Sequence, residues 1–169
     1  MRKLSIRISA VLIIIGLTGC FAEDYDVGVQ RAYLLADDSL RGQPMPLTEA
    51  NITWSSSSGE IVETIEDIEE LGLSQEVTTV SPNQPASLDF KENEENGGDI
   101  WTDPTITASL WKDGEETELE LNESREFRFP QTEGDYVLEV KFIDRDDEAQ
   151  YVGNIIIEQL AETGNDEAK

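Results

Sequence analysis

The chain has 169 residues, of which 37 are acidic and 12 are basic, and it contains no histidine, so its formal charge is −25. Such acidity argues against a nucleic-acid-binding protein and against direct adhesion to anionic lipid headgroups or anionic wall polymers. It fits cationic partners, divalent cations or a generally solvated surface, and the even spread of the acidic residues along the chain favours the solvated surface.

The N-terminus has the form of an export leader. Three basic residues, Arg2, Lys3 and Arg7, precede an apolar run over 8–17. That run is well short of the ~20 apolar residues that a membrane-spanning helix needs, and it has the length expected of a signal-peptide core. The pattern therefore predicts a signal peptide over residues 1–19.

The leader ends in Leu17-Thr18-Gly19-Cys20, and Cys20 is the single cysteine of the chain. This tetrapeptide resembles the lipobox of bacterial lipoproteins. The resemblance implies that a signal peptidase recognises Leu17 and Gly19, that the chain is cut before Cys20, and that the Cys20 thiol carries a diacylglyceryl group. Two or more acyl chains suffice for stable anchoring, since each buried CH₂ contributes ~0.8 kcal/mol. A plain secretory leader is the alternative, but no Ala-x-Ala-like site is present, and an uncleaved membrane anchor is the other.

The chain is therefore predicted to consist of four regions. They are the signal peptide 1–19, a lipidated tether 20–26, a folded domain 27–160 and a disordered acidic tail 161–169. The leader holds three of the 12 basic residues and none of the 37 acidic ones, so the mature chain keeps nine basic residues and a formal charge of −28. Its length of about 150 residues suits one domain of ordinary size, and a single cysteine allows no intramolecular disulfide. Whether residues 21–75 join that domain or form a small lobe is left open.

The first elements of the folded part are short. Turn residues and alternating apolar residues predict a strand over 27–35, a loop over 37–46, a strand over 50–54 and a turn over 55–59.

The segment 60–73 shows a helical pattern. Its apolar residues recur every three or four positions, at Ile61, Ile65, Ile68 and Leu71. Ser57 and Glu60 have the spacing of a capping box, and Gly72 has the place of a C-terminal stop. We therefore predict one short helix near 61–72, and a bent strand over 60–64 is the alternative.

From residue 75 onward the chain reads as β throughout. The predicted strands are 77–80, 86–90, 106–111, 118–121, 127–129, 136–142 and 151–157. Asp113-Gly114 is a hairpin turn signal, because glycine tolerates positive φ. In the long strand, Glu139 and Lys141 lie opposite an apolar face made of Tyr136, Leu138, Val140 and Phe142. Residues 91–99 are predicted to form an exposed, charged loop.

Short strands at intervals of about ten residues predict a mostly β fold, a β-sandwich. The stretch 132–140, followed by a hairpin and a final strand, resembles the end of immunoglobulin-like domains. In those domains a tyrosine near the start of the penultimate strand ties down the preceding corner, and Tyr136 has the matching place. The paired core cysteines of antibody domains are missing, and neither Trp101 nor Trp111 is assigned as the core tryptophan. The run 111–157 also resembles a module of small Gram-positive lipoproteins of unknown function.

Nothing in the sequence points to an enzyme or to a bound cofactor. The serine cluster 55–58 has no histidine to act as its base, so a polar turn explains it better. Carboxylates are so common that no catalytic pair stands out, and a glycosidase would need two facing each other across a cleft.

Calcium is the metal that the residue types favour, because it prefers carboxylate and carbonyl oxygens. Weak candidate ligands lie in the last hairpin tip, at Asp144, Asp146, Asp147 and Glu148, and in the charged loop, at Glu92, Glu94, Glu95 and Asp99. Neither group has the spacing of a dedicated calcium loop, so a solvated tip and a solvated loop are the simpler interpretation.

These observations predict a lipid-anchored binding or assembly module on the outer face of a bacterial cell membrane, and the C-terminal resemblance favours a Gram-positive cell. Its acidity suggests a basic protein as partner. A calcium-stabilised envelope protein is the first alternative, and a small wall-polymer hydrolase is the second.

Overall fold

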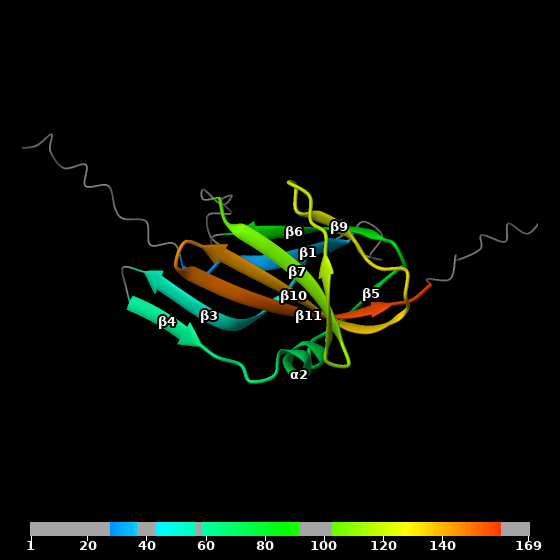
Figure 1. Ribbon diagram of the computed structural model, residues 1–169, viewed down its shortest axis with the longest axis horizontal. Helices are drawn as coiled ribbons and strands as arrows, with labels where there is room; N and C mark the ends of the chain where they lie inside the picture. Colours follow the sequence, from blue (N-terminus) through cyan, green and yellow to red (C-terminus); the bar gives the residue numbers. More distant parts are fainter. Residues whose placement is uncertain (1–27, 37–42, 57–58, 92–102, 160–169) are drawn as a thin grey trace, which may run out of the picture.

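Two β-sheets packed face to face make up the protein, with one short helix on the outside of the larger sheet (Figure 1). The structure is a computed structural model and describes residues 28–36, 43–56, 59–91 and 103–159. The expected mostly β sandwich with one short helix is confirmed.

The smaller sheet has four strands in the order β2-β1-β6-β9, all antiparallel. Their bounds are Arg31–Ala36 for β1, Met45–Pro46 for β2, Pro85–Lys91 for β6 and Glu126–Arg128 for β9. The two-residue strand β2 lies inside the region predicted to be a loop, where Met45 pairs with Leu34 of β1.

The larger sheet has seven strands, six of them in the order β4-β3-β11-β10-β7-β8. The bounds are Thr48–Ser56 for β3, Gly59–Glu63 for β4, Val77–Val80 for β5, Thr105–Lys112 for β7, Glu115–Leu119 for β8, Gly134–Asp144 for β10 and Asp147–Ile157 for β11. The seventh strand, β5, runs parallel to the last four residues of β11. β11 thus pairs with β3 along its first part and with β5 along its second.

The connectivity from β5 to β11 is that of an immunoglobulin-like sandwich. β7, β10 and β11 pair as the C, F and G strands do, and β6 and β9 pair as B and E do. The hydroxyl of Tyr136 at the start of β10 donates a hydrogen bond to the carbonyl oxygen of Thr132 at 3.1 Å. The predicted tyrosine corner is therefore confirmed. Strands β1 to β4 extend both sheets, so the described residues before 75 pair into the same sandwich.

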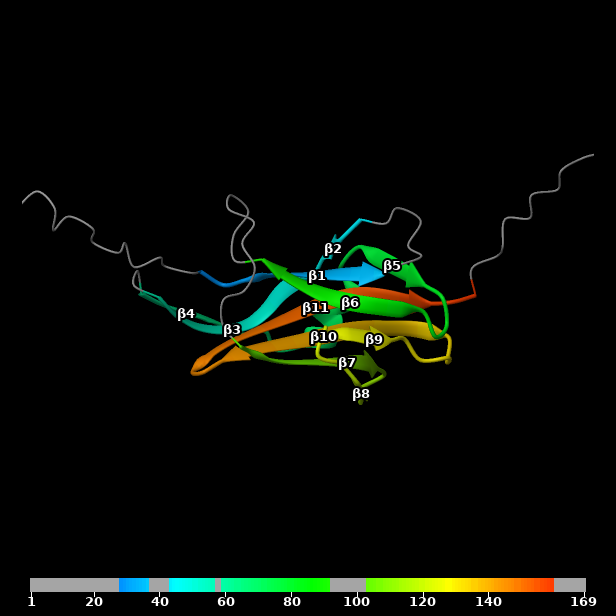
Figure 2. The same cartoon turned by 90° about the horizontal axis from the view of Figure 1, so that it is seen from above.

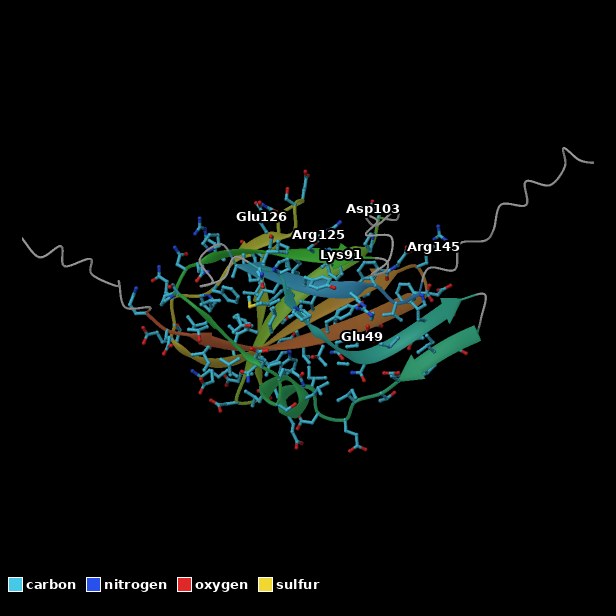
Figure 3. The ribbon with its side chains drawn as sticks, turned by 180° about the vertical axis from the view of Figure 1, so that it is seen from behind. Glu49, Lys91, Asp103, Arg125, Glu126 and Arg145 are labelled. Atoms are coloured by element: carbon cyan, nitrogen blue, oxygen red, sulfur yellow. The ribbon has the colours of Figure 1, made fainter. Side chains whose placement is uncertain are left out.

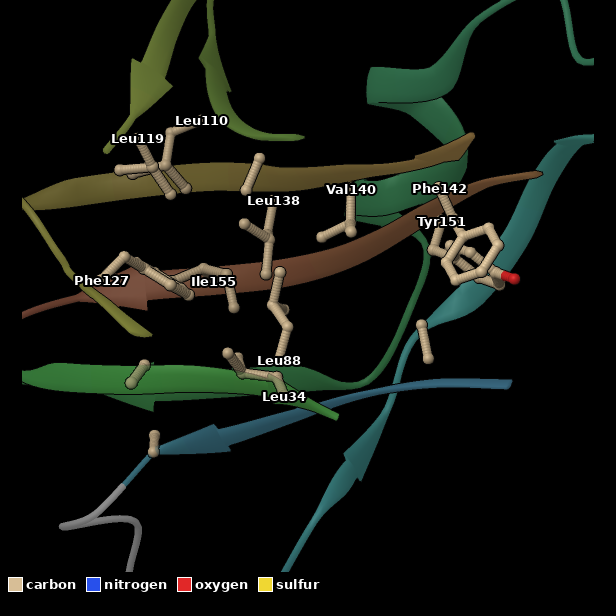
Figure 4. Close-up of a cluster of buried hydrophobic side chains, with 14 of the residues drawn as sticks. Leu34, Leu88, Leu110, Leu119, Phe127, Leu138, Val140, Phe142, Tyr151 and Ile155 are labelled. Atoms are coloured by element: carbon tan, nitrogen blue, oxygen red, sulfur yellow. The ribbon is translucent and has the colours of Figure 1, made fainter. Parts of the chain in front are cut away.

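The core lies between the two sheets and is rich in aromatic rings (Figure 4). Phe90 of β6 and Phe142 of β10 meet with ring centroids 5.2 Å apart, and Phe142 also contacts Trp54 of β3. Among the described residues, Trp54 is thus the tryptophan of the main core, whereas the sequence analysis considered only Trp101 and Trp111 for this place. The predicted apolar faces of β6 and β10 both point into this core.

The segment predicted as one helix contains a strand and a shorter helix. β4 covers 59–63, and α2 covers Ile68–Leu73. Asp67 caps α2, accepting a hydrogen bond from the Glu70 amide at 2.9 Å, so the predicted capping box at Ser57 and Glu60 is wrong. Glu60 instead pairs with Ser55 in the β3–β4 ladder, because the β-branched residues after it suit a strand.

α2 covers part of the outer face of the larger sheet. Ile65, Ile68 and Leu71 pack there on Val137 and Val152, in a second apolar cluster separate from the main core. Gly72 is not the helix stop that the sequence suggested, since the C-terminal cap is Ser74. A Cβ atom at Gly72 would overlap the Val137 side chain, so this position needs glycine for close approach.

Several segments and residues singled out in the sequence lie outside the described residues. These are the signal peptide 1–19, Cys20, the tether to 26, the charged loop at 92–99 with Trp101, and the tail 161–169. Within the part of the chain that the structure describes, no helix has the length and apolar character to cross a membrane.

Candidate binding site

The tip of the β10–β11 hairpin holds the acidic residues that the sequence offered as calcium ligands. Arg145, with a φ of 59°, and Asp146 form the two-residue turn, and Asp144 and Asp147 face each other across it. Asp147 accepts a hydrogen bond from the Ser55 amide of β3 at 2.8 Å, so it ties two hairpins together. Among the described residues no three carboxylates gather in a way that could hold a metal ion.

A buried carboxylate lies on the outer face of the larger sheet, on the side of β10 that the sequence analysis set opposite the apolar face. Glu139 of β10 is 2% exposed. Its Oε2 accepts a hydrogen bond from the Trp111 indole at 2.6 Å, and its Oε1 lies 3.0 Å from the Lys141 ammonium. Gln150 of β11 also donates to Oε1. Both carboxylate oxygens of Glu139 therefore have polar partners.

This network links four strands of the larger sheet, β3, β7, β10 and β11, and the segment just before α2. Gln150 accepts a hydrogen bond from the side chain of Asn51, and Asn51 accepts one from the Ile65 amide at 2.6 Å. Burial lowers the pKa of Lys141, but the hydrogen bond and attraction from Glu139 outweigh it, so the pKa stands above its ordinary value. A charged lysine and a fully bonded carboxylate make this network a structural one.

The sequence could not reveal this network, because it depends on strand register. Glu139 lies opposite Ser109 of β7 and Val152 of β11. Trp111 comes two residues after Ser109, and Gln150 comes two residues before Val152. The one signal available was a glutamate between apolar residues of the long strand.

A groove lies between β8 and β9, each of which is the last strand at one end of its sheet. Both strands are labelled in Figure 2. The volume of the groove is about 710 Å³. The buried side chains of Leu119 and Phe127 form its apolar floor, and its charged lining consists of three acidic residues, Glu118, Glu120 and Glu126, and one basic residue, Arg128. Glu126, labelled in Figure 3, begins β9.

A second groove of about 530 Å³ lies where β11 changes its partner from β3 to β5. Met45, Leu47 and Val77 line it over Gly153, where an added Cβ would come within 2.8 Å of the Leu47 side chain. The Thr78 hydroxyl donates a hydrogen bond to the Met45 sulfur at 3.0 Å. The two grooves thus differ in character, since the groove between β8 and β9 has the denser acidic lining.

Two further groups with shifted pKa values are Tyr151 of β11 and Glu49 of β3, which lie opposite each other in the sheet. Burial, then the charge of Glu49, raises the pKa of Tyr151, whose hydroxyl donates to the Gln30 carbonyl oxygen at 2.5 Å. Partial burial, then the nearby Glu63, raises the pKa of Glu49, while Arg31 opposes this (Figure 3 shows Glu49). The surroundings of Tyr151 and Glu49 therefore shift both groups towards their neutral forms.

No family model matches this sequence, and no curated protein matches it.

Proposed function

We propose that this chain is a lipid-anchored binding module on the outer face of the cell membrane, that it is not an enzyme, and that its partner is a basic protein. The acidic groove between β8 and β9 is the observation that carries this proposal. An apolar floor with a charged rim is the usual composition of a protein-binding surface, and complementary charge selects partners and speeds their encounter.

The sequence around Cys20 supports the anchor. A short apolar leader followed by Leu-Thr-Gly-Cys is the pattern that lipoprotein processing requires, and two acyl chains give stable membrane attachment. The immunoglobulin-like fold supports a binding role, because such domains present sheet edges and loops to partners.

The anchor is tested by feeding cells a labelled fatty acid and comparing the wild-type protein with Cys20→Ala. We expect label and membrane location for the wild type only. Label on neither protein, or an unlabelled wild type in the medium, would contradict lipid anchoring.

The binding role is tested by crosslinking in cells that carry either form. We expect a basic protein enriched with the lipidated form and depleted with Cys20→Ala. Recovery of no protein with either form would contradict the binding role, and so would turnover of wall fragments by the purified protein.

A further inference from the structure

The geometry points to strand addition as the mode of binding: an extended segment with alternating basic and apolar side chains would pair with the free edge of β8 and fill the adjacent groove. This inference rests on the proposed function, since it names the site and the form of the partner.

β8 has a free edge. It pairs with β7 on one side and is the last strand of its sheet, and the sheets contribute no described strand on its other side. The β7–β8 turn consists of Asp113 and Gly114, both with positive φ, as in a type I′ turn. The Gly114 amide lies 3.3 Å from a carboxylate oxygen of Glu69 in α2, which helps to fix the hairpin.

The register shows which backbone groups are available. In a two-residue hairpin the residues that flank the turn, here Lys112 and Glu115, form a hydrogen-bonded pair, and the next pairs alternate. Leu110 and Thr117 then form a hydrogen-bonded pair. Glu116, opposite Trp111, and Glu118, opposite Ser109, belong to non-hydrogen-bonded pairs. The amide and carbonyl groups of Glu116 and Glu118 therefore point to the free edge.

The two faces of β8 offer different chemistry. Thr117 lies opposite the core residue Leu110 and so shares the inner face with Leu119, while Glu116 and Glu118 lie on the outer face. Successive side chains of an added strand would likewise alternate between the faces. Those on the outer face would meet the two glutamates, which favours lysine or arginine, and those on the inner face would meet the apolar floor at Leu119 and Phe127.

A second copy of this chain fits the edge poorly. β8 paired with another β8 would bring glutamates against glutamates, which is destabilising, and the mature chains repel each other with a formal charge of −28 each, nine basic against 37 acidic residues. The same charges would attract a cationic strand, so a basic partner segment is the occupant that the edge selects.

The test uses the full lipidated protein in detergent micelles and a synthetic peptide of alternating lysine and valine as the probe. Binding is followed by fluorescence anisotropy, and amide hydrogen exchange is measured for each residue of β8. We expect slower exchange at Glu116 and Glu118, little change at Thr117, and weaker binding as salt screens the charges. A peptide of the same composition with its lysines and valines in separate blocks should bind at least about tenfold more weakly.

Two variants separate charge from strand pairing. Glu118→Ala removes a carboxylate but keeps the amide, whereas Glu118→Pro also removes the outward amide, a change that an edge strand tolerates. We expect Glu118→Pro to weaken binding about tenfold more than Glu118→Ala does. Thermal unfolding checks both folds, and hydrogen exchange on the wild type needs neither variant.

Equal losses in the two folded variants, or unchanged exchange at Glu116 and Glu118 when peptide binds, would overturn strand addition. Failure of the peptide to bind would overturn it as well. The proposed function has its own test, because crosslinking in cells would still recover a partner bound elsewhere on the protein.

Discussion

At the scale of single residues, Glu139 is the carboxylate on which the outer face of the larger sheet depends. Its removal would leave the Trp111 indole, the Gln150 amide and the Lys141 ammonium without their shared acceptor. The Lys141 ammonium is partly exposed and can turn to solvent, but a buried donor left without its acceptor costs about 1–3 kcal/mol. We expect Glu139→Ala to fall in this range in urea unfolding at neutral pH. The exposed control Glu123→Ala should stay within about 0.5 kcal/mol of wild type, and a similar value for Glu139→Ala would contradict the structural role.

Glu49 should behave in the opposite way. Partial burial and Glu63 raise its pKa in the folded protein, so ionisation costs stability as pH rises through that raised pKa. We expect Glu49→Gln to have a higher melting temperature than wild type at neutral pH. The difference should shrink at a pH below the ordinary value of 4.5, where both the folded and unfolded wild type are protonated at this position. A lower melting temperature for the variant at neutral pH would show that Arg31 dominates instead.

At the scale of elements, the contact between α2 and β10 depends on Gly72. Alanine at this position would gain ~1 kcal/mol of helix propensity but would press on Val137, and overpacking costs about 1–3 kcal/mol. We expect Gly72→Ala to be destabilising in urea unfolding. The double variant Gly72→Ala/Val137→Ala should lose less than the sum of the two single variants, and strict additivity would contradict the contact.

The alternation of apolar residues and the identity of the turn residues made most strands predictable. Val77–Val80 is a strand as expected, and the Asp113-Gly114 turn and the faces of β6 and β10 are as the sequence indicated. The segment 60–73 was harder because its isoleucines satisfy both periods. Glu60 and Ile61 pair with β3, while the stripe from Ile65 onward packs on Val137, and only the tertiary partners separate the two.

The groove between β8 and β9 could not be predicted from the sequence, for a different reason. β8 was predicted from its apolar residues, Leu119 and Leu121, without any indication that it is the last strand of its sheet. The groove forms because β8 and β9, which belong to different sheets, end on the same side of the sandwich. Such neighbourhoods follow from topology, and the acidic residues of β8 alone resembled any solvated surface.

At the scale of the whole molecule, charge repulsion should govern stability. The full chain has a formal charge of −25, and removal of the predicted signal peptide would make it −28, nine basic against 37 acidic residues, so screening by salt should stabilise it. The Debye length falls from about 30 Å at 0.01 M to about 3 Å at 1 M ionic strength. We expect the melting temperature to rise over this range in sodium chloride. Calcium chloride at equal ionic strength should give the same melting temperature, and a markedly higher one would favour the calcium-stabilised alternative.

We propose that a membrane-held domain binds a basic partner at the groove beside β8. Photo-crosslinking in cells tests it most directly, with the reactive group at Glu120 in the groove and, as control, at Val62 on the opposite edge of the same sheet. We expect a basic protein to crosslink from Glu120 in the wild-type background, and neither from Val62 nor in the Cys20→Ala background. Crosslinks of equal strength from both positions, or none from Glu120, would contradict binding of a partner at this groove.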